Sequence, residues 1–215
     1  MRSLVVSLTS VGCSKVVVLG DSNTCGSYAG CVTGDTAFWP ARLTALPAWP
    51  PGWLVENDGY LGMTAGDYAG TLGDGQPGSG MWRLEQLIAA HADFDSCAQP
   101  PGLHPKFVIA LGTNDVAVRG ATGFGVGSKV LMLYERAIQV PCVDVYVATI
   151  PPRVGIDPNL IALANVTIQM RVPADRIIPF GTEPVSDLGP GGVHMTPDGQ
   201  AHRAALAFPV LFTTQ

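Results

Sequence analysis

Ser22 and His194 lie far apart in the sequence, but together they could perform nucleophilic catalysis. Ser22 lies in a Gly-Asp-Ser-Asn-Thr segment directly after the apolar run Lys15–Gly20. A serine at a turn between a buried strand and the next helix presents its hydroxyl where backbone N–H groups stabilise developing negative charge. His194 follows a glycine-rich stretch and could accept the serine proton. Taken singly, Ser22 would be explained as a helix N-cap and a histidine as a structural residue, so the pair has to be judged with its surroundings.

Two further segments offer hydrogen-bond donors for the oxygen of a reacting carbonyl group. Gly62, in the segment Asn57–Thr64, could bring its backbone N–H close to a substrate. Asn114, in the Gly-Thr-Asn-Asp segment at 112–115, could direct its side-chain amide at the same oxygen. Each segment by itself is typical of an ordinary turn.

The elements that must position these residues alternate between strands and helices. Five short apolar runs are predicted to be strands: Lys15–Gly20, Trp53–Glu56, Phe107–Leu111, Val143–Ala148 and Arg176–Phe180. Helical spacing of apolar residues predicts helices over Met81–Ala92, Lys129–Gln139 and Asn159–Met170. A C-terminal helix is predicted to begin with Thr196 as its N-cap. This alternation indicates an α/β domain whose parallel sheet gathers the polar turns at the carboxyl ends of its strands.

Length and composition narrow the function further. The 215 residues are expected to form one domain over 1–215, with 1–14 as an extension before the first core strand. The net charge is −5 and no cluster of Lys and Arg occurs, so nucleic acid is not an expected partner. No apolar run reaches the roughly 18 residues of a transmembrane segment. The first residues resemble a signal peptide only loosely, and the compartment and the oligomeric state stay open.

Neither a metal centre nor a cofactor is predicted. The sequence contains no HExxH or CxxC motif, and its four histidines are scattered. The segment GDSNTCGS lacks the lysine and the glycine spacing of a phosphate-binding loop. The glycine-rich stretch Gly120–Gly127 is predicted to be a loop beside the site. The five cysteines are expected to be buried thiols, although Cys25 and Cys31 are close enough in sequence to form a disulfide.

In this order and spacing, the four segments GDSNT, NDGYLG, GTND and GVHMTP resemble the characteristic blocks of the SGNH (GDSL-like) hydrolase superfamily. The resemblance covers essentially the whole chain from Lys15 onward. It implies a three-layer α/β/α sandwich with a flavodoxin-like, mostly parallel five-stranded sheet. It also implies a serine esterase that cleaves a small-molecule, glycan or lipid ester. Ser22 would be the nucleophile and His194 its base, while Ser22, Gly62 and Asn114 would form the oxyanion hole.

The sequence departs from the family pattern at Gly191, where the family has an aspartate three residues before the histidine. Three interpretations remain open. Asp187 could reach His194 across the loop Leu188–Gly192 and serve as the acid of a triad. Ser22 and His194 could instead work as a dyad, with a backbone carbonyl holding the imidazole. In the third interpretation the domain is inactive and binds a carbohydrate or a protein partner.

Overall fold

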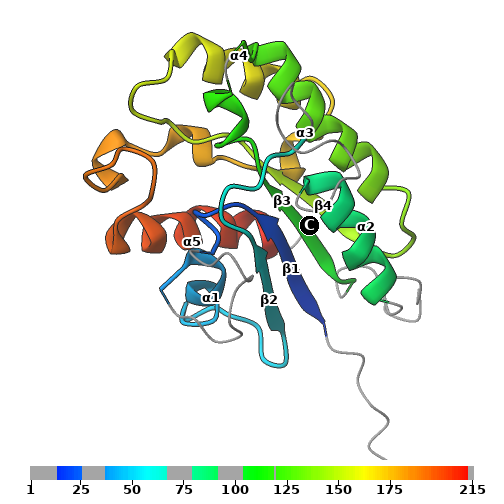
Figure 1. Cartoon of the computed structure of the whole chain (residues 1–215). Helices are drawn as coiled ribbons and strands as arrows, with labels where there is room; N and C mark the ends of the chain where they lie inside the picture. Colours follow the sequence, from blue (N-terminus) through cyan, green and yellow to red (C-terminus); the bar gives the residue numbers. More distant parts are fainter. Residues whose placement is uncertain (1–13, 26–36, 67–78, 92–103, 119, 213–215) are drawn as a thin grey trace, which may run out of the picture.

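Parallel strands form the centre of the molecule. The computed structural model describes residues 14–25, 37–66, 79–91, 104–118 and 120–212. Within these ranges, the strands form one sheet in the order β2-β1-β3-β4-β5, and every neighbouring pair is parallel (Figure 1). The strands are β1 (Lys15–Gly20), β2 (Leu54–Gly59), β3 (Lys106–Ala110), β4 (Asp144–Ala148) and β5 (Ile177–Ile178).

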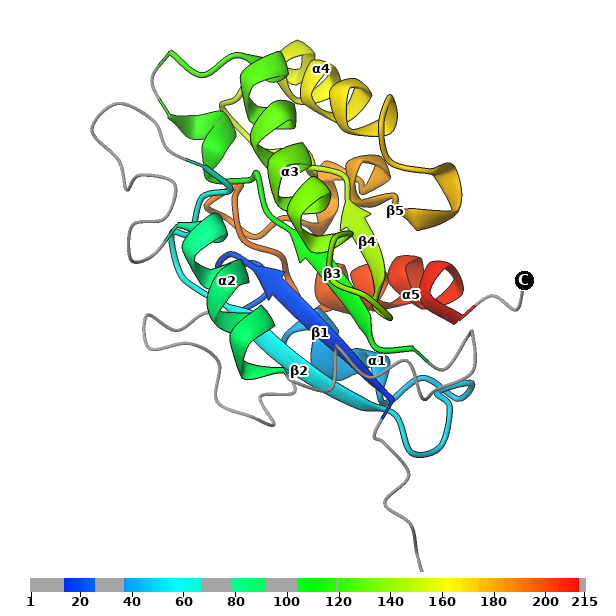
Figure 2. The same cartoon turned by 90° about the vertical axis from the view of Figure 1, so that its right-hand side faces the viewer.

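Helices cover both faces of this sheet. One layer contains α2 (Gly80–Ala90), α3 (Gly123–Ala137) and α4 (Pro158–Gln169), and the other contains α1 (Trp39–Leu43) and α5 (Pro197–Phe212). Figure 2 shows α2 and α3 in front of the strands and α1 and α5 behind them. The predicted three-layer α/β/α sandwich with a five-stranded parallel sheet is therefore confirmed.

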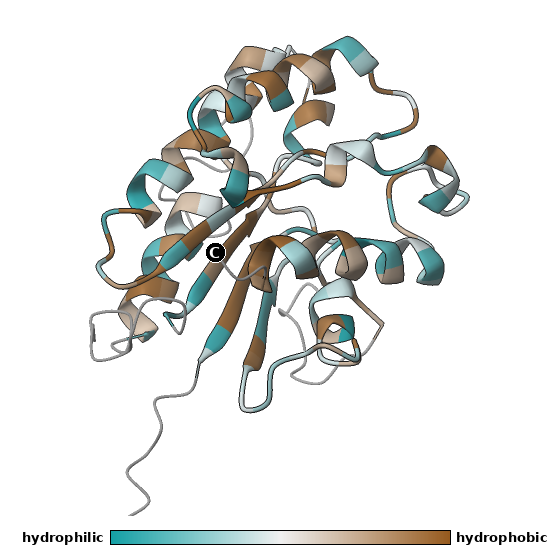
Figure 3. Cartoon of the chain, turned by 180° about the vertical axis from the view of Figure 1, so that it is seen from behind, coloured by the Kyte–Doolittle hydropathy of each residue, from teal (hydrophilic) through white to brown (hydrophobic). Residues whose placement is uncertain are grey.

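The alternation of side chains along β1 explains why two hydrophobic cores form. Val17 and Leu19 belong to the core under α2, α3 and α4, whereas Val16 and Val18 belong to the core under α1 and α5. All four side chains are completely buried, as expected for an apolar strand covered on both faces. Figure 3 shows the strands largely in the brown of hydrophobic residues.

The predicted strands agree with the structure to within one residue at each end, except for β2 and β5. β2 begins one residue later than predicted and runs on to Gly59, which pairs with Gly20 of β1. The strand predicted over Arg176–Phe180 is reduced to Ile177–Ile178, because 3-10 turns precede and follow it. Pro179 comes directly after this short strand and has no N–H to continue the ladder.

The helices predicted over Met81–Ala92, Asn159–Met170 and from Thr196 onward are α2, α4 and α5. The Ser79 hydroxyl accepts from Trp82 N at the start of α2. Thr196 Oγ1 accepts the N–H of Gly199 at 3.0 Å, which confirms its role as N-cap.

The prediction of a loop over Gly120–Gly127 is wrong from Gly123 onward. α3 begins at Gly123 rather than at Lys129, and the side chain of Thr122 caps it. The reason is packing, because a Cβ atom on Gly123 would lie 2.5 Å from the carbonyl oxygen of Leu160 in α4. The glycines therefore allow two helices to approach each other closely, a use of glycine that looks like a loop in sequence.

Two cysteines also differ from the prediction. Cys25 and Cys142 are both disulfide-bonded, so the expectation of buried thiols is wrong for them. Cys31, the candidate partner of Cys25, lies outside the described residues. In the part of the chain that the structure describes, none of the helices combines the length and the hydrophobicity needed to cross a bilayer.

Candidate active site

The turn that carries Ser22 is tight and fixed by its own backbone. The N–H groups of Thr24 and Cys25 both donate to the carbonyl of Asp21, at 2.9 and 3.0 Å. A Cβ atom on Gly20 would lie 2.0 Å from Thr24 Oγ1, so glycine is required where β1 enters the turn. Ser22 is buried, with 5% of its surface exposed. The turn therefore holds a serine hydroxyl rigidly at the carboxyl end of a central strand.

His194 meets this serine directly. Its Nε2 lies 3.0 Å from Ser22 Oγ, although the two residues are 172 positions apart in the sequence. This distance suits proton transfer from the hydroxyl to the imidazole. Nε2 accepts that proton when the other ring nitrogen, Nδ1, carries the hydrogen of the neutral ring. The structure thus brings together the two residues that the sequence analysis singled out first.

The loop around His194 is held by its backbone. Gly189 N–H donates to the carbonyl of His194 at 2.8 Å, and Leu188 pairs with Met195 in an antiparallel bridge. From the β4–α4 loop, Val154 N–H donates to the carbonyl of Gly192 at 2.9 Å. These bonds fix the position of His194 in the absence of an aspartate at 191.

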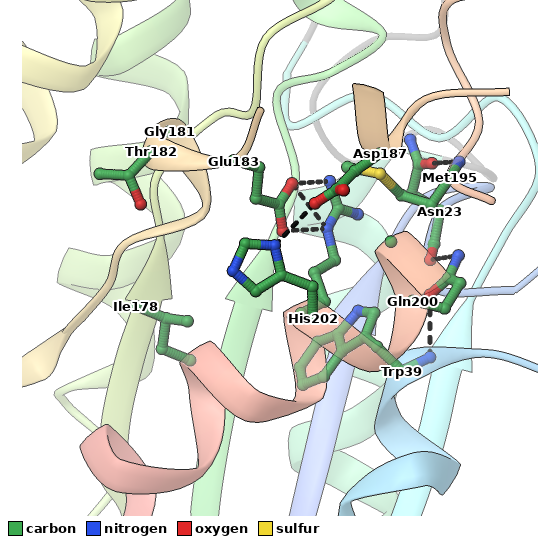
Figure 4. A network of polar contacts seen from close by, with 12 residues as sticks. Asn23, Trp39, Ile178, Gly181, Thr182, Glu183, Asp187, Met195, Gln200 and His202 are labelled. Atoms are coloured by element: carbon green, nitrogen blue, oxygen red, sulfur yellow. Dashed lines mark hydrogen bonds and ion pairs between the residues drawn. The ribbon is translucent and has the colours of Figure 1, made fainter. Parts of the chain in front are cut away.

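Asp187 is directed at a different histidine. Its Oδ2 lies 2.6 Å from Nδ1 of His202 in α5 (Figure 4). The carbonyl of Asp187 accepts from both the N–H and the hydroxyl of Thr196, at 2.8 and 3.0 Å. Among the described residues, no carboxylate is hydrogen-bonded to His194. The structure therefore gives no contact for the predicted role of Asp187 as the acid that orients His194.

Asn23 and Gln200 connect the turn that carries Ser22 to the segment that follows His194 (Figure 4). Asn23 Oδ1 accepts from the N–H of Met195, the residue after His194, at 3.2 Å. The carbonyl of Asn23 accepts from Nε2 of Gln200 at 3.1 Å, and Oε1 of Gln200 accepts from Trp39 N at 2.9 Å. Neither side chain is part of the site predicted from the sequence. Asn23 lies beside Ser22 in the motif, but a contact over this sequence separation leaves no local signal.

The three predicted oxyanion donors lie in turns that are joined to one another. Gly62 has a φ of +78°, which favours glycine, and within the described residues neither its N–H nor that of Ser22 has a hydrogen-bond partner. One N–H of the Asn114 amide donates to the carbonyl of Met63 at 3.0 Å. The second N–H of that amide has no hydrogen-bond partner among the described residues.

Asp115 is a further residue that the sequence analysis did not single out. Its carboxylate is completely buried and accepts from the N–H of Ala65 at 2.9 Å and of Gly66 at 3.3 Å. These bonds fasten the segment that contains Gly62 to the segment that contains Asn114. The last residue of the GTND motif is thus a structural link between the two donors.

Buried charges lie beneath the site. Burial raises the pKa of Asp21, while the N–H of Asn23, 2.9 Å from Oδ1, and the positive charge of Arg203 act in the opposite direction. Arg203 forms a buried ion pair with Glu183 at 2.8 Å, and Figure 4 shows Glu183 close to His202. Burial also raises the pKa of Glu183, against the lowering effect of Arg203. This ion pair fastens α5 to the segment that leads to Asp187.

Several solved structures share this fold over nearly the whole chain. A protein assigned as an arylesterase from Agrobacterium tumefaciens aligns with 24% identity and a TM-score of 0.64, over 92% of this chain and 98% of its own. The aryl esterase of M. smegmatis aligns with 16% identity and a TM-score of 0.67, over 94% of this chain and all of its own. A member of the G-D-S-L family from Desulfitobacterium hafniense aligns with 18% identity and a TM-score of 0.54, over 92% and 99%.

No protein-family model matches the sequence, and no curated protein matches it. The likeness to solved structures, at these identities, shows the fold. The chain therefore has the fold of the SGNH, or GDSL-type, hydrolases, which agrees with the resemblance found in its four sequence segments.

Proposed function

We propose that this chain is a serine ester hydrolase of the SGNH type, in which Ser22 and His194 act as a dyad. The observation that carries the proposal is the 3.0 Å contact between His194 Nε2 and Ser22 Oγ at the carboxyl end of β1. The described esterases of the same fold support ester hydrolysis as the reaction class. The carboxyl edge of a parallel sheet is also where such folds bind their ligands.

The reaction would proceed through an acyl-enzyme. Ser22 Oγ attacks the ester carbonyl carbon while its proton moves to His194 Nε2. The former carbonyl oxygen becomes negative, and the N–H groups of Ser22 and Gly62 and the amide of Asn114 stabilise it. The alcohol leaves with the proton from His194. Water, deprotonated by the same imidazole, then attacks the acyl group and releases the acid and free Ser22.

A dyad is preferred over a triad because Asp187 contacts His202 and not His194. The carboxylate pairs with His202, and the loop backbone together with Asn23 holds the segment of His194. Removing the acid of a catalytic triad lowers kcat about 10⁴-fold, yet the remaining rate is still about 10³- to 10⁴-fold above that in water, because oxyanion stabilisation and substrate binding remain.

The test is hydrolysis of p-nitrophenyl acetate at about pH 6–9, together with labelling by a fluorophosphonate probe. Ser22→Ala should abolish labelling and lower kcat by at least about 10⁴-fold, because the nucleophile is lost. Ser186→Ala, at an exposed serine away from these contacts, is the matched control and should retain both. A folded wild-type protein that neither hydrolyses the ester nor reacts with the probe would instead indicate a binding domain without catalysis.

A further inference from the structure

Arg153 lies in the loop between β4 and α4, where two parts of the proposed site meet. Its Nη1 donates to the carbonyl of Thr113 at 2.6 Å, and this carbonyl belongs to the peptide that joins Thr113 to Asn114. The neighbouring Val154 donates its N–H to Gly192 in the loop that carries His194. The loop with Arg153 therefore touches both the segment of the oxyanion donor and the segment of the general base.

Among the residues that the structure describes, no acidic side chain forms an ion pair with Arg153. Five other arginines form ion pairs with a carboxylate: Arg83, Arg136, Arg171, Arg176 and Arg203. Arg153 is half-buried, and its hydrogen bond within the described residues goes to the uncharged carbonyl of Thr113. A guanidinium has five N–H donors, and those of Arg153 that do not bind Thr113 have no partner in the described part of the chain.

The chemistry of this position selects an anion. A guanidinium binds a carboxylate with two parallel hydrogen bonds, a stronger contact than those between neutral groups. The net charge of the chain is −5, so a local cation at the site matters for attracting such a ligand. Beside it, Val154 is 57% exposed and offers an apolar surface for hydrocarbon between an ester and a carboxylate.

We propose that Arg153 binds an anionic group of the substrate, a carboxylate in the acyl or the alcohol part of the ester. This proposal rests on the esterase function proposed above. It assigns to Arg153 a specificity role that is separate from the stabilising bond to Thr113. A merely structural role would affect charged and neutral esters alike, whereas a carboxylate contact would affect charged esters more.

The experiment compares kcat/KM for matched pairs of esters. The acyl arm uses p-nitrophenyl hydrogen adipate against p-nitrophenyl hexanoate, and the alcohol arm uses para-acetoxybenzoate against its methyl ester. Wild type should prefer the anionic member in one arm. Arg153→Met should lower the anionic-to-neutral ratio in that arm by about tenfold or more, as expected for the loss of a charged hydrogen bond. Arg153→Lys should lower the ratio less, because lysine keeps the positive charge and loses only the paired hydrogen bonds of the guanidinium.

Arg42→Met is the matched control, because Arg42 also bonds a backbone carbonyl, that of Ala37 at 3.2 Å, but lies on α1. This variant should leave the ratio unchanged. A wild type without preference in either arm overturns the proposal, and so does an unchanged ratio in Arg153→Met. If Arg153→Met does not fold, the salt dependence of the wild type decides. KM for the preferred anionic ester should rise with ionic strength while KM for its neutral partner stays constant, and parallel behaviour refutes the proposal.

A failure of the esterase function itself looks different. In that case the wild type hydrolyses none of the four esters, and Ser22 does not react with the fluorophosphonate. A failure of the Arg153 proposal alone leaves hydrolysis and labelling intact and removes only the dependence on charge.

Discussion

His194 and His202 lie on either side of the start of α5, and their side-chain partners differ. His194 contacts the hydroxyl of Ser22 at 3.0 Å and has no carboxylate partner among the described residues. His202 contacts the carboxylate of Asp187 at 2.6 Å and, in the same part of the chain, no serine hydroxyl. The three side-chain types of a catalytic triad are all present, but they are divided between two histidines.

This difference indicates how an imidazole can be positioned in two ways. His202 is on a helix, and a charged hydrogen bond determines its direction. His194 is on a loop. The carbonyl of His194 accepts from Gly189 N–H, and the N–H of the next residue, Met195, donates to Asn23 Oδ1. A backbone that is fixed on both sides restricts the side chain it carries, so in the proposed dyad the loop would provide part of the orientation that a carboxylate provides in a triad.

The largest difference in activity is expected when His194 and His202 are replaced in turn. We expect His194→Gln to lower kcat/KM for p-nitrophenyl acetate by at least about 10³-fold, because the general base is lost. His202→Gln should change kcat/KM by less than about threefold, since His202 contacts no proposed reacting group. Steady-state kinetics on both variants, with thermal unfolding as the control for folding, provides the measurement. Equal losses in the two variants would contradict the division of roles.

The next largest effect should come from Asn23, which connects the two catalytic segments. Asn23→Ala removes the acceptor for Met195 N–H, so we expect kcat to fall about 10- to 100-fold through misplacement of His194. KM should change by less than about twofold, because Asn23 is buried and exposes almost no surface to which a substrate could bind. Asn159→Ala, on the exposed start of α4, is the control. A change confined to KM would argue against a positioning role.

A carboxylate introduced beside His194 tests whether this imidazole lacks a carboxylate partner. Gly191 has open space around its Cβ position and no positive φ, so Gly191→Asp is compatible with the loop. We expect kcat to rise about tenfold if the new carboxylate stabilises the protonated imidazole. Asp187→Asn should alter kcat by less than about threefold, and its half-exposed pair with His202 should cost at most about 1 kcal/mol of stability. A large loss of kcat in Asp187→Asn would instead make Asp187 the catalytic acid.

The smallest effect concerns Asp21, the buried carboxylate next to Ser22. Its pKa is raised by burial, so the folded protein holds this proton to higher pH than the unfolded chain. Stability from this group is therefore lost as pH rises above the ordinary aspartate pKa, near about 3.9. Asp21→Asn keeps an acceptor for Asn23 N–H but has no such loss. Its free energy of unfolding relative to wild type should rise from about pH 4 to pH 7 in urea titrations, and a falling difference would contradict the assignment.

Much of the fold was predictable because its signals are local. The run Val16–Leu19 is apolar on both faces, which is what a central parallel strand needs. Pro179 and the glycines at 123 and 127 misled the prediction for the opposite reason. Their effect depends on a strand ladder and on the backbone of α4, which are not adjacent in sequence.

The types of the proposed reacting groups, and the turn that presents the proposed nucleophile, can be read from the sequence. Gly20 and the serine two residues later define a tight turn after a buried strand, and both features are contained within a few residues. The pairing of His194 with Ser22 was expected from the sequence segments, whereas the histidine partner of Asp187 emerged only from the tertiary structure. His194 and His202 are both near Asp187 in sequence, so spacing leaves the choice open. The backbone bonds of the loop and the path of α5 point one imidazole at the serine and the other at the carboxylate.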